Sequence, residues 1–288
     1  MKIGKLAVIG VGLIGGSFSL ALKKAKAVKH VVGVGRTRRN LDVAARMGVI
    51  DEVERDARIA VRDADLVLIG TPVGQMPEIM AQIRPALTER TVVTDAGSTK
   101  QDVIEYARRF LGEHLERFVP AHPIAGTENS GAAAAFAELY RDRNVIMVPQ
   151  SGTKASAVRL VRAAWEACGA RIVRLGAREH DEIFAAVSHL PHVVAFTLVS
   201  MLAKRPDART LLGFSGGGLR DTVRIAGSSP EMWRDICIAN RDALLELLDA
   251  YTDEIELARA AIGNARHSGR SIRHSASASR RNLANGHP

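Results

Sequence analysis

The sequence predicts an α/β domain with a mostly parallel sheet, followed by an all-α domain. Up to about residue 176, short apolar runs alternate with helical patterns, as in parallel strands connected by helices. From about Ala177 onward the pattern is almost entirely helical. A chain of 288 residues, 47% of them apolar, suits about two domains and is too apolar for wholesale disorder. We therefore expect domains at 1–176 and 177–265 and a tail at 266–288.

The N-terminal segment has the composition of an export signal. Lys2 and Lys5 precede an uncharged run over residues 6–22, and small residues at 25 and 27 would suit a cleavage site. Glycines within that run would weaken a continuous helix, and 17 residues is marginal for crossing a bilayer. A second interpretation explains the glycines by their positions, and we favour it.

That interpretation is a strand, a glycine-rich turn and a helix. The β-rich run 5–9 leads into Gly-Val-Gly-Leu-Ile-Gly, and an Ala- and Leu-rich stretch follows to about Ala27. This context is typical of a dinucleotide-binding turn, in which the glycines allow a tight turn, close approach of a pyrophosphate and close packing of helix on strand. The pyrophosphate would lie at the helix N-terminus. The cofactor-binding residues would be Gly10, Gly12, Leu13, Ile14 and Gly15.

The residue after the next strand, about His30–Val34, should contact the adenosine ribose of the cofactor. Sites for NAD usually place Asp or Glu there. Here Gly35 is followed by Arg36, which leaves room for a 2′-phosphate and offers a permanently charged donor. We therefore expect NADP+ to be favoured, with NAD+ as the alternative. These arginines could instead form a solvated loop and helix start.

The remaining elements of the first half follow in alternation. Ligands bind beyond the carboxyl ends of parallel strands, so residues 71–73, 95–98 and 122–126, directly after strands, are site candidates, with Thr71 and Pro72 next to the cofactor. The expected strands are Leu66–Ile69, Thr91–Thr94, Arg117–Val119, Asn144–Val148 and Arg171–Leu175, and the expected helices are Leu41–Met47, Met76–Leu87, Gln101–Leu111 and Ser156–Cys168.

Two long segments dominate the second half. Residues 180–203 are largely apolar but contain polar residues and Pro191, which favours a buried helix with a kink or break over a membrane span. Ser229-Pro230-Glu231 has the pattern of a helix start. We expect this helix to run to about Ile262, with an apolar stripe that forms a dimer interface.

Four groups of polar residues carry the candidate chemistry. His122 should follow a strand at the cofactor-facing edge, where imidazole could act as a general base. The pair of histidines in Ser-His-Leu-Pro-His is a weak candidate for a metal site, because no cysteine or acid lies nearby in the sequence. Two arginines one helical turn apart could reach one pocket, or could belong to a surface turn paired with Asp221. The groups are Asp95–Lys100, His122–Gly131, Ser188–His192 and Gly216–Ala226.

Over about residues 5–262 the chain resembles the prephenate/arogenate dehydrogenase (cyclohexadienyl dehydrogenase) family. The resemblance rests on GxGLIGGS from Gly10, HPIAGTE from His122, VSHLPH from Val187, GGGLRDTVRIA from Gly216 and SPEMWRDI from Ser229, in this order. It implies a Rossmann-like N-terminal domain, a helical C-terminal domain that dimerises, and oxidative decarboxylation of prephenate, or of L-arogenate, with hydride transfer to NAD(P)+ in tyrosine biosynthesis.

The same resemblance implies roles for individual residues. His122 matches the catalytic histidine and Ser98 the serine that assists it. Arg224 matches the arginine that binds a substrate carboxylate, and Glu128 an acid near the substrate side chain. Family members often keep an acid at the end of the second strand, and Gly35 departs from this pattern. The other positions implied to line or support the substrate pocket are His189, His192, Gly217 and Trp233. Arg220 is a further candidate for substrate binding from its spacing alone, one helical turn before Arg224.

The net charge of +9 falls partly on the tail 266–288, which holds five arginines and no acid and is expected to be disordered. A nucleic-acid-binding regulator using this tail is an alternative that no helix-turn-helix pattern or aromatic interleaving supports. Another dehydrogenase of a hydroxy acid or imine is the nearer alternative. Cys168 and Cys237 form no CxxC pair, which favours a reducing, cytoplasmic location. We expect a small-molecule substrate, a homodimer, and no bound metal, membrane or specific nucleic acid.

Overall fold

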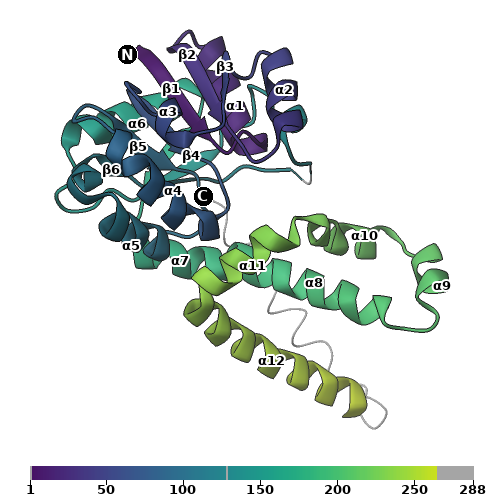
Figure 1. Cartoon of the computed structure of the whole chain (residues 1–288). Helices are drawn as coiled ribbons and strands as arrows, with labels where there is room; N and C mark the ends of the chain where they lie inside the picture. Colours follow the sequence, from purple (N-terminus) through teal and green to yellow (C-terminus); the bar gives the residue numbers. More distant parts are fainter. Residues whose placement is uncertain (1, 128, 265–288) are drawn as a thin grey trace. The chain divides into compact units, whose positions relative to one another are not determined.

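The structure is a computed structural model that describes residues 2–127 and 129–264. Its first part is built on a parallel sheet with strand order β3-β2-β1-β4-β5-β6 (Figure 1). The sequence pattern did not show the short strand β3, whereas it predicted β6 to within one residue, over Arg117–Val119. The strands are β1 Ile3–Ile9, β2 Val28–Val34, β3 Glu52–Glu54, β4 Leu66–Ile69, β5 Val92–Asp95 and β6 Phe118–Val119.

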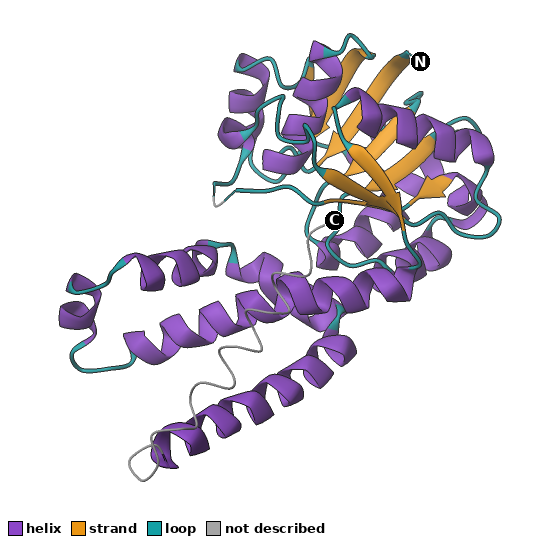
Figure 2. Ribbon diagram, turned by 180° about the vertical axis from the view of Figure 1, so that it is seen from behind, coloured by secondary structure: helices purple, strands orange, loops and turns teal. Residues whose placement is uncertain are grey.

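Helices cover both faces of this sheet (Figure 2). Successive side chains of a strand point to opposite faces, so Leu6 and Val8 of β1 pack with α1, α2 and α6, whereas Ala7 and Ile9 pack with α3, α4 and α5. Both faces of the sheet are therefore buried, which explains why the strands consist of continuous apolar runs. These helices are α1 Leu13–Lys24, α2 Arg38–Arg46, α3 Ala57–Ala60, α4 Met76–Ile83, α5 Gln101–Phe110 and α6 Ala155–Ala167.

Three further strands form a separate sheet of order β7-β8-β9. Its strands are β7 Ala121–Pro123, β8 Asn144–Met147 and β9 Arg171–Arg174. β8 and β9 are parallel, but β7 runs antiparallel to β8, with His122 opposite Ile146. The alternation of apolar runs predicted strands near 144 and 171 and did not show that they leave the main sheet. Pro120 separates β6 from β7 and lets the chain change sheets at that point.

Every element after β9 in the described part of the chain is helical, as predicted. Residues 177–203 form α7 Ala177–Phe184, a π-helical turn Ala185–His189 and α8 Leu190–Ala203. Where a kink or break was expected near Pro191, the helix continues and instead contains this π-turn, which ends two residues before the proline. The expectation of a buried helix is wrong for α8, of which Ala195 is the only buried residue. By length and composition this run could also cross a membrane, a weak indication because soluble proteins contain such helices.

The helix predicted from Ser229 to about Ile262 is instead two helices. α11 Pro230–Ala239 begins as expected, with the Ser229 hydroxyl accepting from the backbone N–H of Met232, and ends at Asn240. The backbone of Asn240 leaves the helical conformation while its side chain turns to other partners. The remaining helices are α9 Ala208–Gly213, α10 Gly217–Arg224 and α12 Arg241–Asn264.

The described part of the chain divides into two units, one up to Arg241 and one from Asp242 onward. α12 is the described part of the second unit, and large apolar side chains along it are exposed, among them Tyr251, Ile255 and Ile262. The expected tail 266–288 lies outside the described residues.

Candidate active site

The turn between β1 and α1 has the geometry that a diphosphate requires. Gly10 has φ +98°, a conformation that favours glycine. A Cβ on Gly15 would lie 2.4 Å from the carbonyl oxygen of Gly10, so helix and turn approach as closely as glycine allows. A Cβ on Gly12 would meet nothing within 4 Å, and Gly12 caps α1 without a side-chain hydrogen bond. The start of α1 therefore has open space at Gly12 and no side chain capping its first N–H groups, as an anion site requires.

Residues beside the turn add to this candidate diphosphate site. Thr71, directly beyond β4, has a buried hydroxyl without a hydrogen-bond partner, and its backbone nitrogen lies 2.9 Å from where a Cβ of Gly10 would be. A buried unpaired hydroxyl beside the turn is consistent with a polar ligand group there. Asn40 holds the turn from the other side, since its Nδ2 donates to the carbonyl of Val11 at 2.6 Å and its Oδ1 accepts from the N–H of Ala132 at 2.9 Å.

The end of β2 carries no acid. Gly35 is half-buried, and a Cβ there would lie 3.2 Å from Leu41. Arg36 is exposed, and its guanidinium lies 3.5 Å from both carboxylate oxygens of Glu231 at the start of α11. A loose, exposed pair of this kind is weak and leaves the arginine available to a phosphate.

His122 lies on β7, and its ring is held by residues of α7. Its Nδ1 is 2.8 Å from Nε2 of His180, and its ring contacts the edge of Phe184 at 4.8 Å between centroids. His180 in turn places its Nδ1 2.7 Å from Oδ1 of Asp181. His180 and Asp181 are fully buried. Three side chains from two elements therefore form one hydrogen-bonded row.

The carboxylate at the end of this row is anchored by the start of α5. Oδ1 of Asp181 accepts from the N–H of Lys100 at 2.8 Å, and Oδ2 accepts from the N–H of Gln101 at 2.9 Å. Burial raises the pKa of Asp181, but the bond to His180 and these two backbone bonds outweigh it, so the pKa lies below its usual value.

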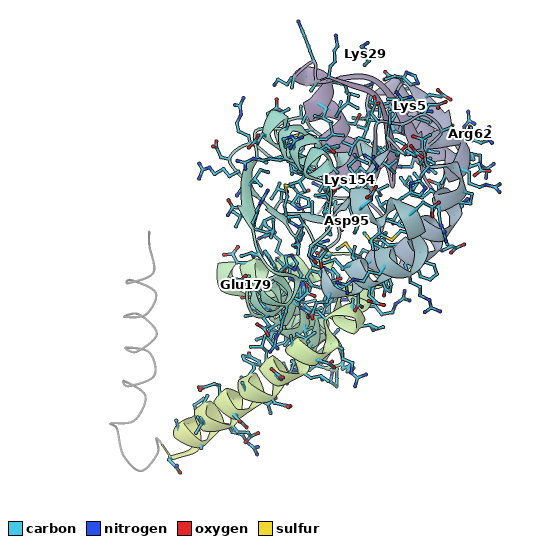
Figure 3. All side chains as sticks on the ribbon, turned by 90° about the vertical axis from the view of Figure 1, so that its left-hand side faces the viewer. Lys5, Lys29, Arg62, Asp95, Lys154 and Glu179 are labelled. Carbon is cyan, nitrogen blue, oxygen red and sulfur yellow. The ribbon has the colours of Figure 1, made fainter. Side chains whose placement is uncertain are left out.

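A second buried pair supports the same region. Lys100 and Asp95 are fully buried and paired through Nζ and Oδ2, and Figure 3 labels Asp95 among the side chains that fill the interior. Asp95 also accepts from the N–H of Gly97 at 2.8 Å and from that of Ala121 at 3.0 Å. The Asp95 side chain thus links β5 to the residue that precedes His122.

The histidines of the site are held neutral. Burial, followed by the charges of His180, Lys100 and His189, places the pKa of His122 well below 6.5. Burial also lowers the pKa of His180, although its bond to Asp181 opposes this. Burial lowers the pKa of His189 to about 4. At neutral pH these rings are therefore unprotonated, as a general base must be.

A second cluster lies where the π-turn meets α11. His192 stacks on Trp233 with 3.6 Å between ring centroids, and His189 meets the same ring edge-on at 6.0 Å. Asn240 donates through Nδ2 to the carbonyl of Asp181 at 2.7 Å and lies 3.0 Å from Nδ1 of His189. His189 Nε2 and Trp233 Nε1 are buried and have no hydrogen-bond partner within the described part of the chain. Buried polar atoms of this kind are expected where a polar ligand binds.

The other residues predicted to be catalytic or to bind substrate, where the structure describes them, lie in the loop after β5 and on α10. Ser98 is half-buried in the loop between β5 and α5 and, within the described residues, makes no hydrogen bond to His122. Gly217, Arg220 and Arg224 are exposed on α10, which packs against α8. Glu128 lies outside the described residues. Over residues 2–127 and 129–264, no group of three metal-ligating side chains gathers.

Sequence reasoning missed His180, Asp181 and Asn240. The signal that could have found the first two is the adjacent His-Asp pair at the start of a helix that follows the last strand. Their meeting with His122, 58 positions earlier in the chain, has no sequence signature. Asp95 and Lys100 belonged to a predicted group, but their pairing was not anticipated.

Two family models divide the chain as the secondary structure does. The nucleotide-binding domain of prephenate dehydrogenase matches residues 18–174, and the dimerization domain of prephenate dehydrogenase matches residues 176–270. A cyclohexadienyl dehydrogenase of Zymomonas mobilis is 38% identical over 261 residues, which cover 90% of this chain and 88% of that protein.

Solved structures agree. A prephenate dehydrogenase from A. aeolicus, in complex with hydroxyphenyl propionate and NAD+, has a TM-score of 0.88 at 30% identity and covers 99% of both chains. A Synechocystis arogenate dehydrogenase has a TM-score of 0.75 at 25% identity, covering 97% of this chain and 99% of that one. The two family models together match most of the chain, and the cyclohexadienyl dehydrogenase of Zymomonas mobilis is 38% identical over 90% of it. This chain therefore belongs to the prephenate dehydrogenase family of oxidoreductases.

Proposed function

We propose that the protein oxidatively decarboxylates prephenate to 4-hydroxyphenylpyruvate in tyrosine biosynthesis, with His122 as general base and NADP+ as the favoured hydride acceptor. The observation that carries this proposal is the neutral imidazole of His122, whose Nδ1 is occupied by His180 so that Nε2 remains for a substrate. L-Arogenate differs from prephenate only in bearing an amino group in place of the side-chain keto oxygen, and is a second candidate substrate.

The proposed reaction needs one base and firm positioning. Nε2 of His122 takes the proton of the ring hydroxyl, and the carbon–hydrogen bond at that ring carbon breaks. The bond to the ring carboxylate then breaks, its electron pair completes the aromatic ring, and CO2 leaves. The oxygen regains a proton and becomes the phenol of the product. Bound nicotinamide supplies the acceptor for the hydride.

We assign the remaining residues to substrate binding. Arg224 would hold a carboxylate through its planar donor fork, and Arg220 would assist one turn away. Nε2 of His189 and Nε1 of Trp233, both buried without partners among the described residues, would meet polar groups of the substrate. His192 would orient the Trp233 ring by stacking. Ser98, Gly217 and Glu128 keep the roles that the family resemblance implies.

For the cofactor, we propose Gly10, Gly12, Leu13, Ile14 and Gly15 at the diphosphate, Thr71 and Pro72 beside it, and Ser98 on the nicotinamide side. Gly35 leaves the ribose without an acidic partner, and Arg36 supports binding of a 2′-phosphate. NADP+ is therefore proposed as the favoured cofactor, with NAD+ also accepted.

At the scale of the chain, we propose domains at 1–176 and 177–265 and a cytoplasmic homodimer formed through the C-terminal helices. Support comes from the dimerization-domain match and from large exposed apolar side chains on these helices, such as Met201, Phe214, Ile238 and Leu257.

Steady-state kinetics with prephenate and L-arogenate, each crossed with NAD+ and NADP+, test this function. Formation of reduced nicotinamide with prephenate is the expected result, with the higher kcat/KM for NADP+. A panel of 3-hydroxy acids serves as the control, because related folds oxidise such substrates. Turnover of a 3-hydroxy acid without turnover of either cyclohexadiene would overturn the proposal.

A further inference from the structure

The row His122–His180–Asp181 determines where the protons of both rings lie. Asp181 is ionised, because both of its oxygens accept backbone N–H groups at the start of α5. Its Oδ1 can therefore only accept from His180, so Nδ1 of His180 carries a proton. With burial lowering its pKa, His180 is neutral, and its Nε2 is an acceptor.

The protonation of His180 in turn determines that of His122. Nδ1 of His122 lies 2.8 Å from that acceptor and must donate to it. A neutral imidazole with a proton on Nδ1 has its lone pair on Nε2, the nitrogen that the proposed reaction needs. The tautomer of His122 is thus decided by a carboxylate two side chains away, through a ring that has no need to touch the substrate.

The row His122–His180–Asp181 can also stabilise the positive charge that forms when His122 is protonated. When His122 takes a proton on Nε2, its Nδ1–H strengthens its bond to His180, or the Nδ1 proton moves to Nε2 of His180. In the second case the positive charge comes to lie beside the Asp181 carboxylate. The other groups that act on His122, the cation Lys100, His189 and the apolar ring of Phe184, carry no negative charge that would stabilise an imidazolium.

We propose that His180 is a positioning residue that fixes His122 in its Nδ1–H tautomer and shares the proton that His122 removes from the substrate, with Asp181 as the anchoring carboxylate. This inference rests on the proposed function of His122 as general base. It follows the logic of a Ser-His-Asp triad, in which a buried acid orients the catalytic imidazole, with a second imidazole inserted between acid and base.

Two substitutions of His180 separate orientation from proton sharing. His180→Gln can still accept from His122 and donate to Asp181 but has no group that titrates, whereas His180→Leu can do neither. We expect kcat to fall by about 10²-fold in both, with KM for substrate and cofactor within about threefold of wild type. In His180→Leu the acidic limb of the pH profile of kcat should also move to lower pH, since the imidazolium of His122 loses the acceptor that His180 provides. His30→Gln, an exposed substitution on β2, is the control.

Full activity of His180→Gln would overturn proton sharing, and a loss confined to KM would overturn the positioning role. A measurement on the unmodified protein guards against a variant that fails to fold. Nitrogen NMR of ¹⁵N-histidine-labelled wild type should show the rings of His122 and His180 protonated at Nδ1 alone. An Nε2–H tautomer of His122 would contradict the proposed direction of the hydrogen bonds in the row. Absence of prephenate oxidation by the wild type would count against the proposed function, and the NMR result is independent of it.

Discussion

His122 shows how a single residue acquires a task from its surroundings. Its position on β7 comes from backbone pairing with β8, its unprotonated state from burial, and its orientation from His180. Each of these depends on segments far from it in the sequence. The residue scale is therefore where substitutions should separate catalysis from binding.

Replacing His122 with Asn should remove the base and leave the pocket almost unchanged in size. We expect kcat to fall by at least about 10²-fold, because general-base catalysis is lost. Binding of prephenate, followed by quenching of tryptophan fluorescence, should stay within about threefold. Turnover near the wild-type rate would show that the proton leaves by another route.

Arg36 should determine the preference between the two nicotinamide cofactors. In Arg36→Ala, loss of a charge-assisted bond to a 2′-phosphate should lower kcat/KM for NADP+ by about 10- to 100-fold, with little effect on NAD+. Arg38→Ala is the matched control, because that neighbouring arginine pairs with Asp42 along α2. Equal losses with both cofactors would contradict a role at the phosphate.

At the scale of elements, Gly12 and Gly15 at the start of α1 are expected to have different roles. Gly12→Ala should leave the thermal midpoint unchanged, because nothing lies within 4 Å of the added Cβ, yet raise KM for the cofactor by occupying the space for the diphosphate. Gly15→Ala should destabilise the fold by about 1–3 kcal/mol, because the added carbon meets the Gly10 carbonyl. Thermal unfolding and cofactor titration of both variants check this; equal thermal midpoints would contradict it.

The junction between α11 and α12 illustrates an element boundary set by tertiary contacts. Periodicity carries the helix past residue 240, and the local sequence gives no glycine or proline to stop it. Asn240 ends α11 because its side chain is needed at the carbonyl of Asp181 and at His189, 59 and 51 positions away. A helix that continued could not place the amide there.

For the whole molecule, stability should fall as the pH is lowered from neutral. The pKa of His189 drops from the ordinary 6.5 to about 4 on folding, so the unfolded chain binds this proton first and stability is lost as pH falls through that window. His189 alone accounts for about 2 kcal/mol between about pH 7.5 and pH 5. The lowered pKa values of His122 and His180 act in the same direction.

Chemical denaturation at these two pH values measures the effect. In His189→Asn the drop should be smaller by an amount near that figure, whereas Lys29→Asn, an exposed substitution on β2, should reproduce the wild-type drop. A drop that is unchanged in His189→Asn would contradict the assignment.

Association should also depend on the helical half. Phe214 is 86% exposed in the single chain and is one of several large apolar side chains exposed in the helical half, as expected of an association surface. We expect sedimentation analysis to show a dimer that Phe214→Asp weakens. Ile59→Asp on α3, an exposed apolar position of the nucleotide-binding part, should leave it intact. A wild-type monomer would contradict the proposed assembly.

Local features of this protein could be predicted from its amino-acid sequence. The strand–turn–helix with its glycines, the order of strands and helices, and the cap at Ser229 all depend on contacts within a few residues, where backbone sterics and hydrophobic period act. The family resemblance also rested on short motifs read in order.

Tertiary structure alone decided the rest. It put β7, β8 and β9 in a sheet of their own, brought His180 and Asp181 against His122, and paired Lys100 with Asp95 in the interior. It also left α8 largely uncovered within the single chain, although its composition suggests a buried helix. Each of these outcomes joins segments distant in sequence, and burial and hydrogen bonding between such segments depend on the folded arrangement, which no local pattern encodes.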